Sequence, residues 1–433
     1  MRTVSKTVIG VDFGTQSARA VLVNAENGEI IYSCRKEYPY NSTPVPAIDC
    51  AENLPCATDY EMTLYELLRN VIPEEYRKTV AGICVDATSL TMVLLAEDGR
   101  ALSELDGWSE AAHARVKLWK YHRAQEKADE ALNLARNLQE PFLGRTGGSI
   151  SCEWMLPKLL EVRDEAPEIY SKIDLAMDLC EFLTFRLTGQ LVRSIGSLSY
   201  KCLWAEDLSF PERTFLNGLR AGFYEEYCHF LRGDVRKPGE CAGMLRSELT
   251  KRWGLPEQIP VATGMLDGHT SLATMGAFEP GDAALIVGTS NVCTVQDRKL
   301  QELKDVCGVA QDGMVTGSCG IDTGQSSTGN MLGWFVEHMA GWQIHREAEE
   351  RKISPHQVLA ERIQKPWENK VIAVDWWSGS RNAPCDLTLR GSMSGLEMDT
   401  KTEDIYLALL QAIACGTGTI LESLSGQGVE IGR

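Results

Sequence analysis

The sequence lacks the short patterns that mark several large classes of enzyme. No Gly-x-x-x-x-Gly-Lys-[Ser/Thr] loop occurs, which excludes a P-loop nucleotide site, and no Gly-x-Ser-x-Gly elbow occurs, which argues against a serine hydrolase. The 14 cysteines form no Cys-x-x-Cys pair, and the seven histidines are not spaced with them as zinc ligands would be. The sequence therefore predicts neither a structural zinc site nor a disulfide scaffold.

A basic surplus, a secretion signal and a long apolar run are missing as well. The net charge of −17 offers no basic stripe for a phosphate backbone, so we expect no nucleic-acid partner. The first residues lead into an apolar run that Asp12 stops, which is unlike a signal peptide, and no segment reaches the ~20 apolar residues of a membrane helix. Cysteines scattered through apolar runs are typical of a reducing compartment. We expect a cytoplasmic protein with no membrane partner.

The most informative stretch that is present lies near the N-terminus. An apolar run over residues 8–11 ends in Asp12, passes through a turn of small polar residues, and resumes as alternating apolar residues over 18–23. This pattern predicts a β-hairpin. A tip without bulk lets a phosphate approach backbone N–H groups, and an acid beside it can hold a hydrated Mg²⁺. We call the tip residues Gly14, Thr15, Gln16 and Ser17 the first phosphate clasp.

The same pattern returns much later in the chain. An apolar run over 283–287 enters a turn and continues as a second strand over 292–295. The turn residues Gly288, Thr289 and Ser290 form the second phosphate clasp. A single Gly-Thr turn is usually only a turn, but two such hairpins in a chain of 433 residues indicate two related domains that close on one nucleotide. We place the boundary near 276–280, which gives domains of 1–277 and 278–433.

Between and after the hairpins, strands and helices alternate. Apolar spacing predicts helices over 58–71, 111–138, 154–162, 169–187, from 270 to 275, and over 405–424, and strands over 80–86, 261–263 and 371–375. Asp86 ends one of these strands and is followed by small polar residues to Thr91, which fits either a pocket wall or a capped turn. Asp267 follows another strand just before a helix, and such an acid is by default a helix N-cap.

Eight longer motifs together resemble one known family, the FGGY carbohydrate kinases within the actin-like ATPase superfamily, and in particular its ribulokinase branch. The resemblance covers essentially the whole chain. The motifs are Val-Asp-Phe-Gly-Thr-Gln-Ser (11–17), Leu-Trp-Lys-Tyr-His (118–122), Ser-Cys-Glu-Trp (151–154), Tyr-Lys-Cys-Leu-Trp (200–204), Leu-Asp-Gly-His (266–269), Val-Gly-Thr-Ser (287–290), Gly-Ile-Asp-Thr-Gly-Gln-Ser (320–326) and Val-Asp-Trp-Trp (374–377). The resemblance implies an α/β fold of two actin-like (ribonuclease H-like) ATPase domains.

The resemblance also implies an activity and roles for particular residues. A member of this branch transfers the γ-phosphoryl group of ATP, with Mg²⁺, to a primary hydroxyl of a ketopentose such as L-ribulose. Asp267 would be the general base, Asp12 would hold Mg²⁺ through water, and both clasps would bind phosphates. The sugar contacts would be Asp267, Lys201, the backbone around Ser89, and Asp322. The expected partners are a sugar and ATP, and a homodimer stays open.

The chain departs from the branch in two ways. Ribulokinases usually carry Glu where this chain has Asp322, and a carboxylate that is one methylene shorter reaches about 1.5 Å less far. Ribulokinases also continue for about a hundred residues past the point where this sequence stops, so we expect the second domain to be incomplete. The alternative is a truncated and catalytically impaired protein, derived from a kinase, with a sugar-binding or regulatory function.

Overall fold

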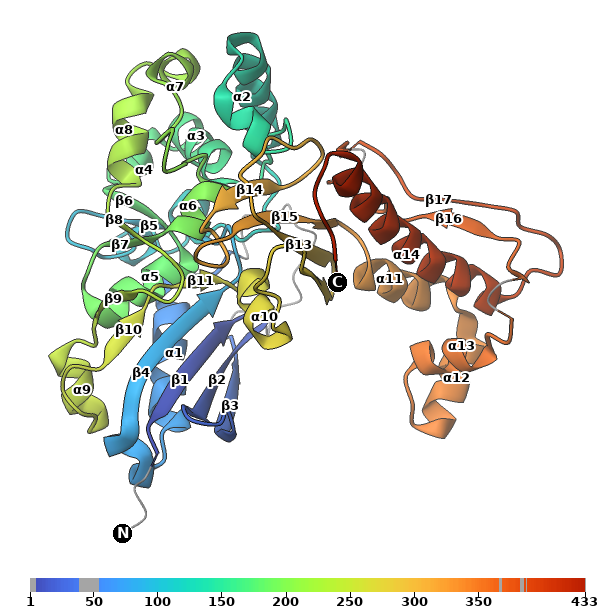
Figure 1. Ribbon diagram of the computed structural model, residues 1–433, viewed down its shortest axis with the longest axis horizontal. Helices are drawn as coiled ribbons and strands as arrows, with labels where there is room; N and C mark the ends of the chain where they lie inside the picture. Colours follow the sequence, from blue (N-terminus) through green and yellow to red (C-terminus); the bar gives the residue numbers. More distant parts are fainter. Residues whose placement is uncertain (1–4, 39–53, 366–367, 382–384, 387, 433) are drawn as a thin grey trace. The chain divides into compact units, whose positions relative to one another are not determined.

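The computed structural model describes residues 5–38, 54–365, 368–381, 385–386 and 388–432 (Figure 1). The chain divides into two compact units. Unit 1 comprises residues 1–143, 150–274 and 310–319, and unit 2 comprises residues 144–149, 275–309 and 320–433. The single boundary expected at 277/278 therefore misses two short segments. Residues 144–149 belong to unit 2, and residues 310–319 belong to unit 1.

A mixed seven-stranded sheet is the centre of unit 1. Its order is β3-β2-β1-β4-β10-β9, with β11 also pairing with β4. The strands are β1 (Thr7–Phe13), β2 (Ser17–Asn24), β3 (Ile30–Glu37), β4 (Val80–Ala87), β9 (Cys241–Met244), β10 (Pro260–Ala262) and β11 (Met265–Leu266). Strand β2 runs antiparallel to both of its neighbours, β1 and β3, whereas β1, β10 and β11 each run parallel to β4. The predicted hairpin and the strand over 80–86 are thus confirmed.

Alternation of apolar and polar residues explains why this sheet forms. Every second residue of β1 is buried, so one face of the strand enters a core with Ile9, Val11 and Phe13. Helices α1 (Ala57–Val71) and α5 (Leu179–Thr188) pack on the sheet. Their buried leucines, such as Leu64 and Leu183, complete the core. The helix predicted over 58–71 is confirmed.

A second core of unit 1 is mostly helical. It contains α2 (Gln125–Leu138), α3 (Met155–Glu165), α4 (Pro167–Tyr170), α7 (Arg213–Leu219) and α8 (Phe223–Phe230). Around it lie β5 (Met92–Leu95), β6 (Leu175–Asp178), α6 (Ile195–Lys201), β7 (Val192–Ser194) and β8 (Asp234–Arg236). Helices α9 (Ser247–Trp253) and α10 (Asp267–Met275) complete the unit.

Two of the predicted helices in this region are wrong in part. The helix expected over 111–138 exists only from Gln125, because the backbone of Lys117 instead exchanges two hydrogen bonds with Met92 of β5. The helix expected over 169–187 is interrupted by β6, whose four residues are all buried and pair with β5. A fully buried run shows no periodicity that separates a strand from a helix. Asp178, the last residue of β6, then caps α5.

Unit 2 is built on a second antiparallel hairpin. Strands β12 (Ala283–Val287), β13 (Asn291–Asp297) and β15 (Cys319–Gln325) lie side by side in this order. Strand β14 (Gly308–Gln311) precedes β15 in the chain. The predicted hairpin over 283–295 is confirmed. Helices α11 (Gly329–Met339), α12 (Gly341–Arg351), α13 (Pro355–Arg362) and α14 (Thr402–Gly426) follow, with β16 (Ile372–Val374) pairing with β17 (Ser392–Ser394).

Helix α14 overturns one expectation from the sequence. The helix is 25 residues long, and its most apolar 18-residue stretch has a mean hydropathy of 1.4 with 33% of that stretch buried. By length and composition alone it could cross a membrane, whereas the sequence predicts no such segment. A core helix of a soluble protein passes the same test. Tyr406 and Leu409 of α14 join a core with Phe335 of α11 and Leu359 of α13, and the helix runs alongside β16 (Figure 1). The predicted helix over 405–424 is therefore present and slightly longer.

Candidate active site

The first phosphate clasp is the tight tip of the β1–β2 hairpin. The N–H of Gly14 donates to the carbonyl of Ser17 at 3.1 Å, which closes the turn. Three side chains then fix it. Tyr38 Oη donates to the carbonyl of Gly14 at 2.9 Å, Trp119 Nε1 donates to Thr15 Oγ1 at 3.1 Å, and Arg35 Nε donates to Ser17 Oγ at 3.0 Å. Gln16 is exposed at the tip. The clasp is thus held rigidly by residues distant in sequence.

Three acids stand at or just after the carboxyl ends of neighbouring parallel strands beside this clasp. Asp12 of β1 and Asp86 of β4 are direct partners in the parallel register, and Asp86 also pairs with Met265 of β11. Asp267 follows β11 immediately. Burial, and then the negative charges of Asp12 and Asp267, raise the pKa of Asp86 to about 8. Burial is thus the main cause of the shift, and the two neighbouring acids add to it.

Asp267 begins α10 and combines two environments. Its Oδ1 accepts the N–H of Gly268 at 2.7 Å, so the N-cap interpretation has a real basis. Burial raises the pKa of the Asp267 carboxyl, the hydrogen bond from Gly268 lowers it, and Asp12 raises it again. The positive charge of Lys201 acts in the opposite direction to Asp12. Asp267 is therefore a half-buried carboxylate that lies among charged groups, as a base for proton transfer would.

Lys201 and Ser89 approach the same edge of unit 1 from two other elements. Lys201 is the last residue of α6 and only 6% of it is exposed. The ring of its neighbour Tyr200 meets the ring of His269 in α10, with centroids 4.8 Å apart. Ser89 lies half-buried in the loop after β4, which is tied to the end of β1 by the N–H of Thr88 donating to the carbonyl of Phe13 at 2.9 Å. Ligands of open α/β sheets collect at such carboxyl ends.

In unit 2 the second phosphate clasp is closed in the same way as the first. The N–H of Gly288 donates to the carbonyl of Ser290 at 3.1 Å. The start of α11 is bound to this clasp, because the N–H of Gly329 donates to the carbonyl of Gly288 at 3.1 Å and that of Asn330 to the carbonyl of Thr289 at 3.1 Å. A Cβ at position 329 would lie 2.5 Å from the oxygen of Gly288, so only glycine permits this approach.

Asp322 belongs to unit 2, on β15, and is 7% exposed. Three residues further along the strand, Gln325 bonds to three different elements. It accepts from Asn291 Nδ2 at 3.0 Å and from Thr417 Oγ1 at 2.7 Å, and its Nε2 donates to Asp375 Oδ2 at 2.6 Å. Gln325 therefore joins the strand after the second clasp to α14. The motif over 320–326 contains this residue, but only the tertiary structure shows these partners.

The sequence leaves the stretch from Asp86 to Thr91 open between a pocket wall and a capped turn, and it gives Asp86 no role of its own. An acid is the next-to-last residue of β4, as it is of β1. That repeated pattern was the available signal. Thr270, which hydrogen-bonds to Asp86, carried no signal of its own.

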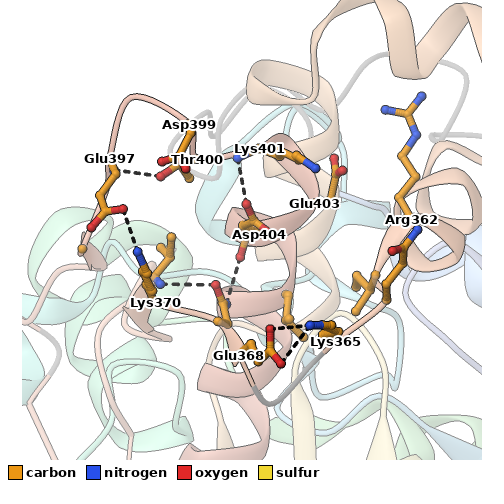
Figure 2. Close-up of a pocket in the computed structure, with 16 residues that line it drawn as sticks. Arg362, Lys365, Glu368, Lys370, Glu397, Asp399, Thr400, Lys401, Glu403 and Asp404 are labelled. Atoms are coloured by element: carbon orange, nitrogen blue, oxygen red, sulfur yellow. Dashed lines mark hydrogen bonds and ion pairs between the residues drawn. The ribbon is translucent and has the colours of Figure 1, made fainter.

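Unit 2 also has a surface hollow of about 560 Å³ between the end of α13 and the start of α14 (Figure 2). None of the predicted site residues lines it. Four of its charged groups form two ion pairs: Lys365 with Glu368 at 2.9 Å, and Lys370 with Glu397 at 2.9 Å. Because these exposed pairs neutralise each other, the hollow does not resemble a phosphate site.

Comparison with known proteins interprets this arrangement. The N-terminal domain model of the FGGY family of carbohydrate kinases matches residues 7–274, and the C-terminal domain model matches residues 283–433. The chain belongs to the FGGY family of carbohydrate kinases. This FGGY kinase is 34% identical to a ribulokinase of Halalkalibacterium halodurans, over 99% of the chain and 78% of the relative. It is 36% identical to a ribulokinase of Mycolicibacterium smegmatis, over 98% of the chain and 77% of the relative.

Solved structures agree on the fold of this FGGY kinase. The xylulose kinase of Rhodospirillum rubrum matches it with a TM-score of 0.75 at 20% identity, over 99% of the chain and 80% of that structure. The chain thus has the actin-like, two-domain α/β ATPase fold that the motifs predicted. It is a phosphotransferase that acts on a sugar.

Proposed function

We propose that this FGGY kinase transfers the γ-phosphoryl group of ATP to a primary hydroxyl of a ketopentose, with L-ribulose as the preferred sugar. The relatives that match it at 34% and 36% identity are both named ribulokinase. The single observation that carries the activity is the half-buried Asp267 at the start of α10, beside the charges of Asp12 and Lys201. A hydroxyl needs a base nearby when it attacks a phosphoryl group.

In the proposed reaction, Asp267 takes the proton of the attacking hydroxyl. The hydroxyl oxygen forms a new bond to the γ-phosphorus, the bond from that phosphorus to its bridging oxygen breaks, and ADP leaves with the electron pair. Lys201, the backbone around Ser89, and Asp322 bind the sugar and orient its hydroxyl. Orientation and neutralisation of charge supply most of the acceleration in phosphoryl transfer, and the base adds about 10²–10⁴-fold.

The residues present fit ATP and Mg²⁺. Both clasps are tight turns of small residues, and α11 starts directly against the second clasp. Asp86 and Asp267 add negative charge near Asp12, which favours a cation there beside the Arg19 guanidinium that lies 3.7 Å from Asp12. Among the described residues, no group of three or more His, Cys, Asp or Glu side chains is arranged to hold a metal directly, so we propose that Asp12 binds Mg²⁺ through water. Bound Mg²⁺ would neutralise charge on the phosphates.

Two further features are part of the proposal. We place the kinase in the cytoplasm, where ATP is available, and propose that α14 stays in unit 2, where its Tyr406 and Leu409 pack in a hydrophobic core. A homodimer is tested by light scattering of the purified chain. No other partner is proposed than the sugar and ATP.

The test combines a sugar panel with one substitution. Initial rates with ribulose epimers, xylulose, glycerol and gluconate should be highest for L-ribulose. Asp267→Asn should lower turnover at least ~10²-fold while leaving sugar affinity within about threefold. The control is Asp207→Asn, which changes an acid outside the predicted site. Glycerol or gluconate as the best substrate would reject the sugar assignment, and near-normal turnover by Asp267→Asn would reject the base.

A further inference from the structure

Leu90, the residue after Ser89, has an unfavourable backbone conformation. Its φ is 61°, in the left-handed region that residues other than Gly and Asn rarely adopt. Its side chain is buried, with 4% exposed, so the loop cannot relax by turning outward. Interactions elsewhere in unit 1 must therefore hold the peptide in place.

Two buried charged residues bond to the two ends of Leu90. Asp178 Oδ2 accepts the N–H of Leu90 at 3.0 Å, and Lys158 Nζ donates to the carbonyl of Leu90 at 2.6 Å. Both side chains are 0% exposed. We call Asp178 and Lys158 the support pair. They come from the end of β6 and from the middle of α3, both far from Leu90 in sequence.

The support pair is bonded to the other sugar-site elements as well. The same Oδ2 of Asp178 accepts from Ser197 Oγ at 3.2 Å, and Ser197 lies in α6, the helix that ends in Lys201. Lys158 Nζ also donates to the carbonyl of Leu118 at 2.9 Å. One carboxylate thus fixes both the Ser89 loop and the helix that carries Lys201.

We propose that Asp178 and Lys158 are positioning residues of the sugar site, which fix the backbone around Ser89 and the place of Lys201. This inference rests on the proposed function, because it takes Ser89 and Lys201 as sugar contacts. A buried charge is costly unless its partners repay the loss of water. Here the partners are the backbone groups of a strained peptide.

Asp178→Asn is the first test, because it keeps the shape of the side chain. One amide oxygen can still cap α5 through Leu179, but the NH₂ group then faces the N–H of Leu90 and the hydroxyl of Ser197. We expect the KM for the sugar to rise at least ~10-fold, which corresponds to about 1.4 kcal/mol. The KM for ATP and kcat should stay within about threefold. Asp164→Asn, which changes an acid bonded to Arg220 elsewhere in unit 1, is the matched control and should leave both KM values unchanged.

A second pair of variants distinguishes positioning from general damage. Leu90→Gly and Leu90→Ala remove the same buried side chain, but only Gly adopts the left-handed conformation without strain. In the Asp178→Asn background, Leu90→Gly should therefore bind the sugar up to ~10-fold more tightly than Leu90→Ala. With Asp178 present, the two should differ by less than about threefold.

The outcomes are separable. Any of three results overturns the inference. The KM for the sugar is unchanged in Asp178→Asn, the two double variants bind the sugar equally tightly, or Asp178→Asn weakens the binding of sugar and ATP to the same extent. If Asp178→Asn does not fold, Lys158→Met replaces it in the same comparison. If another sugar is the best substrate of the unmodified enzyme, the assignment of L-ribulose fails, and the variants are compared with that sugar.

Discussion

Replacing Asp86 by Asn should flatten the dependence of stability on pH. Burial, followed by the charges of Asp12 and Asp267, raises the pKa of Asp86 from 3.8 to about 8 in the folded protein. The folded chain therefore holds a proton that the unfolded chain releases. The resulting stabilisation is fully present below the unfolded pKa and is lost as the pH rises through the folded pKa of about 8.

The size of the effect follows from the pKa difference. About four pKa units at 1.36 kcal/mol each give an upper limit on the order of 6 kcal/mol. Water penetration and relaxation reduce such costs in real proteins, so we expect about 2–4 kcal/mol between about pH 5 and about pH 8. Asn cannot ionise, and its NH₂ group can donate to Asp12 as the protonated carboxyl does. The variant should therefore melt higher than the parent at about pH 8, and the difference in melting temperature should shrink as the pH falls towards about 5.

Scanning calorimetry over this pH range, in a chelating buffer without nucleotide, measures the difference. Asp98→Asn is the control. The carboxylate of Asp98 is exposed, and its hydrogen bonds from the backbone and side chain of Arg100 lower its pKa, so this substitution acts only in acid. If the melting temperatures of the Asp86 variant and the parent change equally with pH, the pKa of Asp86 is not raised in the folded protein and the reasoning is refuted.

Two further substitutions test how the clasps are held. Tyr38→Phe removes the 2.9 Å hydrogen bond to the carbonyl of Gly14 in the first clasp, which is worth about 0.5–1.5 kcal/mol. The KM for ATP should rise about 2–10-fold and the KM for the sugar should stay unchanged. A variant with the same KM for ATP as the parent would contradict this. Gly329→Ala places a Cβ 2.5 Å from the oxygen of Gly288 and should cost about 1–3 kcal/mol of stability and weaken ATP binding in calorimetry. Gly333→Ala on the same helix meets nothing within 4 Å and should be neutral or stabilising; similar losses in both variants would refute the reasoning.

Local features of this protein could be predicted from its sequence. Both hairpins were found because strand alternation and turn residues are properties of adjacent positions. The helix over 57–71 and the start of α10 beside Asp267 follow from the same kind of short-range pattern. The family and its fold were also accessible, since the motifs that carry them are continuous stretches of sequence.

Longer-range features depended on the tertiary structure. Residues 115–124 have helical spacing, yet the backbone of Lys117 exchanges hydrogen bonds with Met92 of β5, so a contact distant in sequence overrides local propensity. Asp86 joins Asp12 only because β1 and β4 are parallel neighbours, which no local pattern specifies. Leu90 receives its support from Asp178, 88 residues away. Short-range sequence patterns set the elements, whereas which charges come together depends on how strands and helices distant in the chain share one core.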